Sequence, residues 1–304
     1  MAYLHSDREQ FRDAIDLAYE QTGVMVQAIE KDYYVTMLLR LLAQRMPYIV
    51  FKGGTSLSKC HKVIRRFSED IDITIDTLLS QGQKKKIKQA IVESAEELGM
   101  TIENLDETRS RRDYNRYVIA YDSVIPMASD ALKAAVLLET SYTAVSFPTV
   151  LLPVHSYIGD MMEQEAPDAI EEYNLNPFEM KVQGIDRTLA DKVFAVCDYY
   201  LQGKVAKHSR HLYDIYKLLP LVPQDENFKE LVKEVRAVRE QSAICPSALP
   251  EANVPELLEK IIKEKAYKQD YDSLTTQLLE ENVPYDTVIA TLKKVAESSI
   301  FENN

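Results

Sequence analysis

Apolar side chains recur every three to four residues through much of the chain, and this spacing predicts a helix-rich protein. Two such stretches open it, one over residues 11–18 and one from Met25 to Arg45. From about Arg187 onward the helical spacing is not interrupted by strand signals, so we expect a bundle of helices there. The apolar positions that define these helices are Phe11, Ala14, Ile15, Leu17 and Ala18 in the first, Ile29, Leu38, Leu39 and Leu42 in the second, and Leu189, Val193, Val196, Leu212, Ile215, Tyr216, Leu219, Phe228, Leu231, Val232 and Val235 in the bundle.

Between these regions the pattern changes to short apolar or alternating runs, which are typical of strands. Residues 48–51 are β-branched or aromatic and run into a Gly-Gly turn, after which residues 55–63 can form a helix. Residues 71–75 alternate apolar and polar side chains, which predicts a strand with one buried face. The spacing of Ile87, Ile91, Ala95 and Leu98 predicts a further helix, which Gly99 can end in a left-handed cap. Further strands are expected at residues 117–121, 134–139 and 179–182.

The bulk composition predicts a globular protein that lies outside membranes. Of 304 residues, 46% are apolar, which is enough for one large domain or two smaller ones. We place a boundary near residue 186, and the two parts can share one core. No apolar run approaches the roughly 20 residues that span a bilayer, and residues 1–10 lack a signal-peptide pattern, so a cytoplasmic location is expected. The three cysteines are widely spaced and favour neither disulfides nor a zinc cluster.

The net charge of −12 argues against a protein that coats nucleic acid without specificity, because phosphate binding depends on clustered Lys and Arg. A local basic surface is still compatible with this total. The groups that could form it are Arg65 with Arg66, the run Lys84, Lys85, Lys86 and Lys88, the group Arg109, Arg111, Arg112 and Arg116, and the stretch Lys204, Lys207, His208, Arg210 and His211.

The turn after the first predicted strand has the composition of a phosphate-binding loop. Gly53 and Gly54 let backbone amides approach a ligand closely, and the hydroxyls of Thr55 and Ser56 add donors at the start of the next helix. A Gly-Gly turn before a helix is also a common structural feature, so both interpretations are open at this point.

Two carboxylates stand at the start of the next predicted strand. Asp70 and Asp72 are two residues apart, so their side chains point to the same side of the strand. Because like charges repel strongly at this spacing unless a cation lies between them, the pair is a ready site for Mg²⁺ or Mn²⁺. An exposed acidic strand edge would have the same pattern.

Together these segments give the order strand, Gly-Gly turn, helix and Asp-x-Asp strand, which suits nucleotidyl transfer. The turn would hold the triphosphate of an NTP, while metal ions on the carboxylates neutralise phosphate oxygens and lower the pKa of the attacking hydroxyl. Two-metal sites usually draw a third carboxylate from an adjacent strand, and Glu139 is well placed to supply it. A simple charge at a strand end is the alternative for Glu139.

Five segments of the chain resemble the AbiEii/AbiGii toxin family of nucleotidyltransferases, within the DNA polymerase β-like superfamily. Three are amino-terminal: residues 29–33 (IEKDY), 51–57 (FKGGTSL) and 66–72 (RFSEDID). Residues 187–192 (RTLADK) and 210–214 (RHLYD) resemble two later motifs of the family. In the commoner form of the last motif Asp directly follows the Arg, whereas this chain has His211 there.

The resemblance implies an α+β fold, in which a nucleotidyltransferase-type mixed β-sheet flanked by helices is followed by an α-helical C-terminal bundle. Residues 1–186 would form the nucleotidyltransferase domain with the N-terminal helices, and residues 187–304 the helical C-terminal domain. It also implies the toxin of a bacterial toxin–antitoxin system of the abortive-infection type, with a cognate antitoxin as partner. Some relatives transfer nucleotides to the 3′ end of tRNA, which makes RNA the expected acceptor.

The family's site residues carry over by position. The resemblance assigns phosphate binding to Gly53, Gly54, Thr55 and Ser56 with Lys59 nearby, metal binding to Asp70, Asp72 and Glu139, a functional hydroxyl open to modification to Ser68, and nucleotide binding to Asp214. Lys192 lies at the edge of an apolar helical stripe, from which it can reach a cleft and offset the charge that builds on the leaving group. A solvated lysine would fit the same position, and the spacing of Arg210 and Asp214 requires only a helix-surface ion pair.

Three hypotheses follow. In the first, the chain is a toxin that transfers NMP from an NTP to RNA, guided by a local basic surface. In the second, the acceptor is a small molecule or a protein hydroxyl. In the third, the chain is a catalytically idle module that binds a partner protein, and the intact Asp-x-Asp pair counts against it.

Overall fold

The computed structural model describes residues 2–68, 70–126 and 133–302. These residues form two compact units. Residues 1–60 and 68–182 make up the first, which we call the sheet unit, and residues 61–67 and 183–304 make up the second, the helical unit. The short segment 61–67 therefore belongs to the helical unit although both of its chain neighbours belong to the sheet unit.

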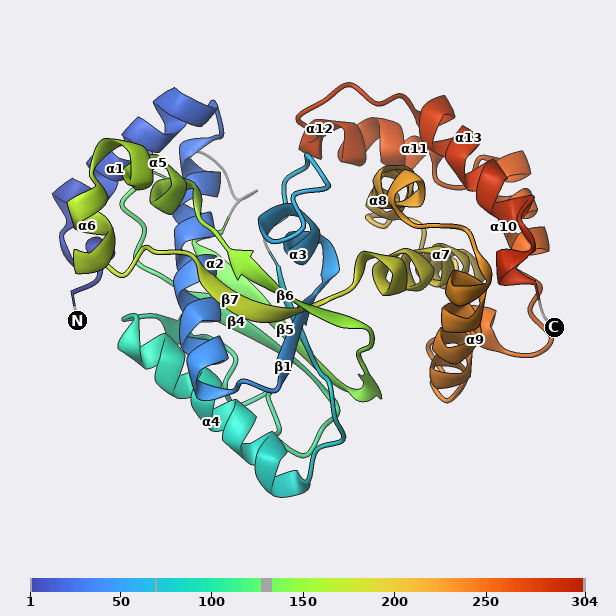
Figure 1. Cartoon of the computed structure of the whole chain (residues 1–304), viewed down its shortest axis with the longest axis horizontal. Coiled ribbons are helices and arrows are strands. Elements are labelled where there is room, and N and C mark those ends of the chain that lie inside the picture. Colours follow the sequence, from blue (N-terminus) through green and yellow to red (C-terminus); the bar gives the residue numbers. More distant parts are fainter. Residues whose placement is uncertain (1, 69, 127–132, 303–304) are drawn as a thin grey trace. The chain divides into compact units, whose positions relative to one another are not determined.

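The sheet unit is built on a mixed sheet with the strand order β3-β4-β5-β2-β1-β7-β6 in the described part of the chain (Figure 1). β1 runs antiparallel to β2 and parallel to β7, β2 runs parallel to β5, and β5 runs antiparallel to β4. The strands are β1 (Ile49–Lys52), β2 (Ile71–Ile75), β3 (Thr101–Ile102), β4 (Tyr114–Ala120), β5 (Ala135–Val145), β6 (Thr149–Val154) and β7 (Phe178–Gln183).

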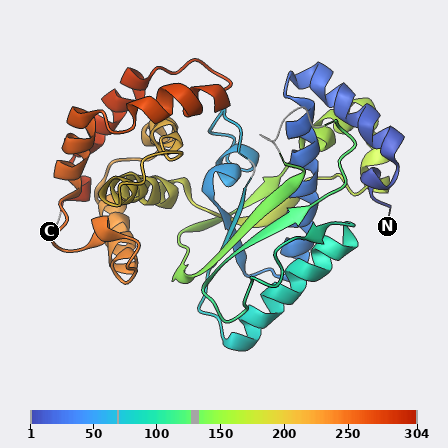
Figure 2. The ribbon, with the colours of Figure 1, turned by 180° about the vertical axis from the view of Figure 1, so that it is seen from behind.

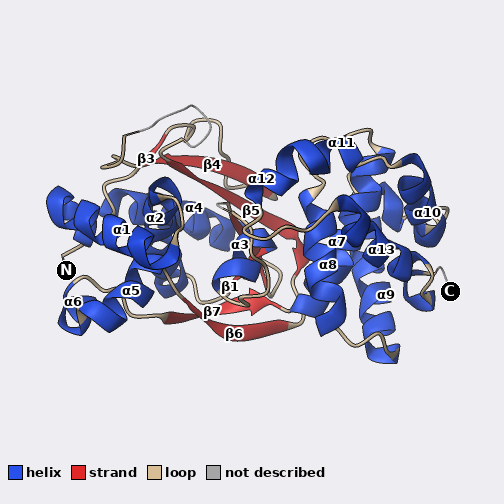
Figure 3. Ribbon diagram, turned by 90° about the horizontal axis from the view of Figure 1, so that it is seen from above, coloured by secondary structure: helices blue, strands red, loops and turns tan. Residues whose placement is uncertain are grey.

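Helices of the sheet unit gather on one side of this sheet, as Figures 2 and 3 show. They are η1 (Leu4–Ser6), α1 (Arg8–Thr22), α2 (Val26–Arg45), α4 (Gln81–Glu97), α5 (Tyr157–Glu165) and α6 (Pro167–Glu172), while the short α3 (Gly53–Lys59) follows β1 directly. Ile71, Ile73 and Ile75 point into the core that these helices form, and all three are fully buried. The alternate positions of β2, which include Asp72, therefore lie on the opposite face.

Local signals explain where these helices begin and end. Asp7 accepts hydrogen bonds from the backbone of Glu9 and Gln10 and so caps α1. Ser80 and Gln83 form a capping box at the start of α4. Gly99, with φ of 64°, follows the end of α4 in the left-handed conformation that the sequence predicts.

Most predicted elements of the sheet unit are confirmed, and three differences are informative. α3 begins at Gly53 and ends at Lys59, earlier than expected, because the chain then leaves to join the helical unit. β6 was not predicted, since its exposed Val150 and Leu151 break the alternation expected of a half-buried strand. Leu17 is 48% exposed, so its assignment to the buried face of α1 was wrong.

The helical unit is centred on α7, which contacts α8, α9 and α10. Its helices are α7 (Ile185–Leu201), α8 (Arg210–Leu218), η2 (Leu219–Leu221), α9 (Glu226–Glu240), η3 (Pro246–Ala248), α10 (Val254–Glu264), α11 (Lys268–Asp270), the π-helical turn η4 (Tyr271–Thr275), α12 (Thr276–Leu278), α13 (Tyr285–Ala296) and η5 (Ser299–Phe301). The segment 61–67 packs here through two backbone hydrogen bonds, from Phe67 N to Leu278 O and from Glu280 N to Arg65 O. In the described ranges, no helix is long and apolar enough to cross a membrane.

Candidate functional site

Four charged residues form a row across the centre of the sheet. Lys52 of β1 pairs with Asp72 of β2, Asp72 pairs with Glu139 of β5, and Glu139 pairs with Arg116 of β4. Directly paired residues project from the same face of a sheet, so the four side chains stand side by side in the order positive, negative, negative, positive. The row lies on the face opposite the buried Ile71 and Ile73.

Gly53 fits closely against the first carboxylate of this row. Its φ of +82° is a conformation that L residues with side chains rarely adopt. A Cβ atom at this position would lie 2.0 Å from Asp72 Oδ2 and 2.9 Å from Asp72 Cγ. The glycine therefore leaves the space that the Asp72 carboxylate occupies.

Asp70 directly precedes β2 and carries an unusual oxygen. Its Oδ1 atom is buried and has no hydrogen-bond partner in the described part of the chain. A buried, unpaired carboxylate oxygen is costly, because it has lost its hydration without gaining a partner. A cation bound by this oxygen would remove that cost, so the donor set suits a hard metal ion such as Mg²⁺.

Glu139 has two partners on β4 that the sequence analysis missed as site residues. Arg116 Nε lies 3.8 Å from Glu139 Oε1. Partial burial, the charge of Glu139 and a hydrogen bond with it raise the pKa of the Tyr114 hydroxyl, and Asp72 adds to this shift. Both β4 residues therefore adjoin the carboxylates, and only the strand register could have revealed this. No three His, Cys, Asp or Glu side chains are grouped as a ready metal site within the described residues.

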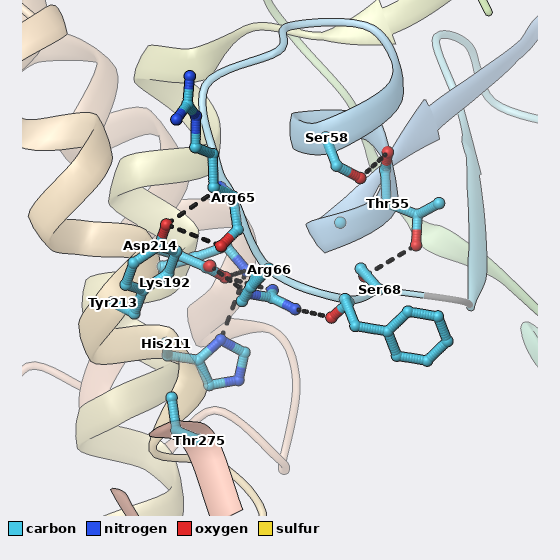
Figure 4. Close-up of polar contacts among 12 residues, drawn as sticks. Thr55, Ser58, Arg65, Arg66, Ser68, Lys192, His211, Tyr213, Asp214 and Thr275 are labelled. Carbon is cyan, nitrogen blue, oxygen red and sulfur yellow. Dashed lines mark hydrogen bonds and ion pairs between the residues drawn. The ribbon is translucent and has the colours of Figure 1, made fainter. Parts of the chain in front are cut away.

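The hydroxyl groups around α3 differ in what they contact. Thr55 Oγ1 lies 2.9 Å from Ser68 Oγ, which brings together two residues predicted to act in the site (Figure 4). The Ser56 hydroxyl is fully buried and donates to Gly53 O at 2.9 Å. Lys59 forms a buried ion pair with Asp32 of α2. The side chains of Ser56 and Lys59 are thus engaged within the protein.

Glu30 and Asp32, the acidic residues of the IEKDY segment, connect α2 to other parts of the sheet unit. Besides its pair with Lys59, Asp32 accepts a hydrogen bond from the backbone of Tyr157 at the start of α5. Glu30 accepts bonds from the hydroxyl of Ser123 and the backbone of Val124. These contacts hold α2 to the segments that follow β4 and β6.

Asp214 lies at the centre of a buried ion cluster in the helical unit. Its side chain is fully buried and accepts two hydrogen bonds from Arg66, at 2.7 and 2.8 Å. Lys192 Nζ lies 2.6 Å from Asp214 Oδ2, the oxygen that also accepts one of the hydrogen bonds from Arg66 (Figure 4). Burial alone would raise the pKa of Asp214, but the charges of Arg66 and Lys192 lower it below its ordinary value. Asp214 therefore pairs with these two cations and makes no helix-surface pair with Arg210.

Lys192 and His211 are neighbours in the same cluster. Lys192 Nζ lies 3.5 Å from His211 Nδ1. Burial, and then the charge of Lys192, lower the pKa of His211 well below its ordinary value of 6.5, so the ring is neutral at physiological pH. Burial also lowers the pKa of Lys192, and the Asp214 carboxylate opposes this shift.

Two of the predicted basic groups are not free surface patches. Arg66, a candidate for the local basic surface, is only 3% exposed and is bound by Asp214, so it does not belong to such a surface. Arg109 and Arg112 donate to backbone carbonyls of their own loop, and Lys88 of α4 donates to Thr108 O in the same loop. Arg116 is half exposed beside Glu139.

Comparisons with known proteins agree with this architecture. A family model described as nucleotidyl transferase AbiEii toxin, type IV TA system, matches residues 36–291. The solved structure of MenT4, a nucleotidyltransferase toxin of Mycobacterium tuberculosis, has a similar fold, with a TM-score of 0.51 at 17% identity over 93% of this chain and 88% of that chain. No curated protein sequence matches the chain. Because the family model covers well over half of its length, the chain belongs to the AbiEii family of nucleotidyltransferase toxins.

Proposed function

We propose that this toxin is metal-dependent and transfers a nucleoside monophosphate from an NTP to the 3′ end of an RNA, with tRNA as the expected acceptor. The observation that carries the proposal is the unpaired, buried Asp70 Oδ1 next to a row in which Asp72 and Glu139 stand side by side. Carboxylates at these positions, beside a glycine turn, suit a divalent cation and the phosphates it accompanies.

Asp70, Asp72 and Glu139 would hold the metal. When bound, a divalent ion such as Mg²⁺ supplies charge that neutralises phosphate oxygens and acidifies the attacking hydroxyl. Gly53 keeps the Asp72 carboxylate in place by leaving room for it. Gly54 and the paired hydroxyls of Thr55 and Ser68 are the protein's own donors for the phosphates.

Lys192 would neutralise charge on the leaving pyrophosphate, and Asp214 would act through Lys192. The Asp214 carboxylate opposes the burial that lowers the pKa of Lys192, and so favours its charged form. Arg66 donates one hydrogen bond to each carboxylate oxygen of Asp214 and so fixes its orientation. In this proposal Asp214 would be a positioning residue for a phosphate-binding lysine. Membership of a type IV toxin family also supports a cognate antitoxin as partner.

An anionic acceptor is favoured over a cationic small molecule. The two carboxylates of the row are flanked by Lys52 and Arg116, although the chain as a whole carries a charge of −12. A positive border attracts an RNA backbone and repels a polycation.

The proposal is tested by incubating the pure protein with Mg²⁺ and each labelled NTP in turn, with and without total RNA, and resolving the products by size. We expect label on a tRNA-sized band, and its loss in Asp70→Ala. Label confined to small molecules or protein would show that the acceptor class is wrong. A folded protein that transfers no label with any NTP would instead support the idle binding module.

A further inference from the structure

The row of charges has two chemically different ends. At the β1 end, Lys52 directly precedes Gly53 and Gly54, the turn assigned above to the triphosphate. At the β4 end, Arg116 stands beside Glu139, and Tyr114 lies two residues away on the same face. If the nucleotide occupies the first end, the hydroxyl that attacks it has to approach the carboxylates from elsewhere. The β4 end is the part of the row that the nucleotide leaves available.

Tyr114 has features of a binding residue. Its side chain is 53% exposed and lies on the same face of β4 as Arg116, so the ring is accessible to a ligand at this end of the row. Its hydroxyl lies within electrostatic reach of the Glu139 carboxylate, so the ring is close to a proposed metal-binding residue. A tyrosine ring has few rotatable bonds, so it loses little conformational entropy when a ligand stacks on it.

Arg116 supplies the complementary charge. Its side chain is 53% exposed, and its Nε atom lies 3.8 Å from Glu139 Oε1, so the guanidinium group is both close to the carboxylate and accessible from solvent. An exposed aromatic ring next to an arginine is the combination that binds single-stranded nucleic acid, because bases stack on the ring and the cation neutralises phosphate.

We propose that Tyr114 and Arg116 form the acceptor subsite of this enzyme. The ring of Tyr114 stacks on the terminal base of an RNA 3′ end, and Arg116 neutralises the adjacent backbone phosphate. Glu139 contacts both residues and so ties the acceptor subsite to the metal-binding carboxylates. The inference rests on the proposed function, because it assumes an RNA acceptor, and it adds which residues bind that RNA.

Binding measurements separate the two ends of the row. The dissociation constant of a 5′-labelled single-stranded RNA with a free 3′ hydroxyl is measured by fluorescence anisotropy, at several salt concentrations and without NTP. Binding of a fluorescent NTP analogue with Mg²⁺ is measured in parallel. The variants are Tyr114→Ala, Tyr114→Phe and Arg116→Ala. Matched controls are Tyr19→Ala and Arg12→Ala, which remove an exposed ring and an exposed guanidinium from α1.

We expect Tyr114→Ala and Arg116→Ala to weaken RNA binding about tenfold, a loss typical of one stacked base or one phosphate contact. Tyr114→Phe keeps the ring and should keep most of the RNA binding. Arg116→Ala should also lower the slope of log affinity against log salt by about one. Binding of the NTP analogue should change less than twofold, and in steady state the KM for RNA should rise while the KM for NTP stays constant.

Two results would overturn the inference. One is unchanged RNA binding in both alanine variants. The other is an equal loss of NTP binding, which would mean that Tyr114 and Arg116 only hold Glu139 in place. A wild-type protein that fails to label RNA in the transfer assay refutes the proposed function, and the RNA-binding comparison still decides the role of these two residues.

Discussion

Replacement of Gly53 by Ala should slow transfer by about 10²-fold or more while leaving the chain folded. A Cβ atom at residue 53 would lie 2.0 Å from Asp72 Oδ2, far inside van der Waals contact. The two nearest atoms, Asp72 Oδ2 and Cγ, belong to the carboxylate and can rotate away. Asp72 Cβ would lie at 3.1 Å and has to shift by only a few tenths of an ångström. We therefore expect the substitution to disturb the position of the Asp72 carboxylate more than the stability of the fold.

The magnitude follows from two contributions. An alanine at a φ of +82° costs about 1–2 kcal/mol relative to glycine. Forcing Asp72 from its rotamer adds about 1 kcal/mol. The free energy of unfolding should therefore fall by about 2–3 kcal/mol, which a domain of ordinary stability survives. Displacing a metal-binding carboxylate by an ångström or more should slow transfer by about 10²-fold or more.

Urea unfolding followed by circular dichroism measures the first effect, and labelled-NMP transfer measures the second. Gly99→Ala is the matched control, because Gly99 has a φ of +64° in the same unit and no atom within 4 Å of its added Cβ. It should lose about 1–2 kcal/mol of stability and keep its activity. A Gly53→Ala protein with wild-type turnover would refute the reasoning, and so would one that fails to fold where Gly99→Ala folds.

Three further predictions concern charge. The pKa of His211 is lowered in the native chain, so below pH 6.5 the unfolded chain takes up a proton that the native chain does not. The free energy of unfolding should therefore fall as the pH drops from 6.5 to 5. Urea unfolding at several pH values should show a smaller fall in His211→Asn, and an equal fall would contradict the lowered pKa of His211. Asp214→Ala removes the carboxylate that pairs with the buried Arg66, and should lower the free energy of unfolding by about 3–5 kcal/mol. Glu297→Ala breaks an exposed pair and should lower it by less than about 1 kcal/mol. Equal losses in urea unfolding would show that burial of the pair is not decisive. Mg²⁺ at about ten times its dissociation constant should add about 1.4 kcal/mol to the free energy of unfolding of the wild-type protein. It should add nothing in Asp70→Asn, because Asp70 Oδ1 is proposed to bind the metal. Equal gains for both proteins in a thermal melt would show that Asp70 does not bind the metal.

Elements with a short-range signal were predicted well. Residues 71–75 were assigned as a strand and form β2 with the same bounds. The left-handed Gly99 after α4 was also expected. Both follow from side-chain periodicity and backbone preferences within a few residues. The family was recognised for a similar reason, since its motifs are short and contiguous.

Contacts between distant segments could not be predicted in the same way. Arg66 and Asp214 are 148 residues apart, and nothing in either segment indicates that one binds the other. The basic pair Arg65 and Arg66 has the composition of a solvated patch, yet Arg66 is buried. Its burial depends on segment 61–67 joining the helical unit, which is a property of the folded chain.

The sequence by itself thus determined the element types, the family and the identity of the acidic residues at the strand end. Only the tertiary structure decided that Lys52, Asp72, Glu139 and Arg116 form one row, because that order depends on which strands pair and in which register. Strand pairing is set by packing across the whole sheet, where a shift of one residue would turn every side chain to the other face. The same register pairs Tyr114 with Ser141 and so places it two residues along from the Arg116–Glu139 pair.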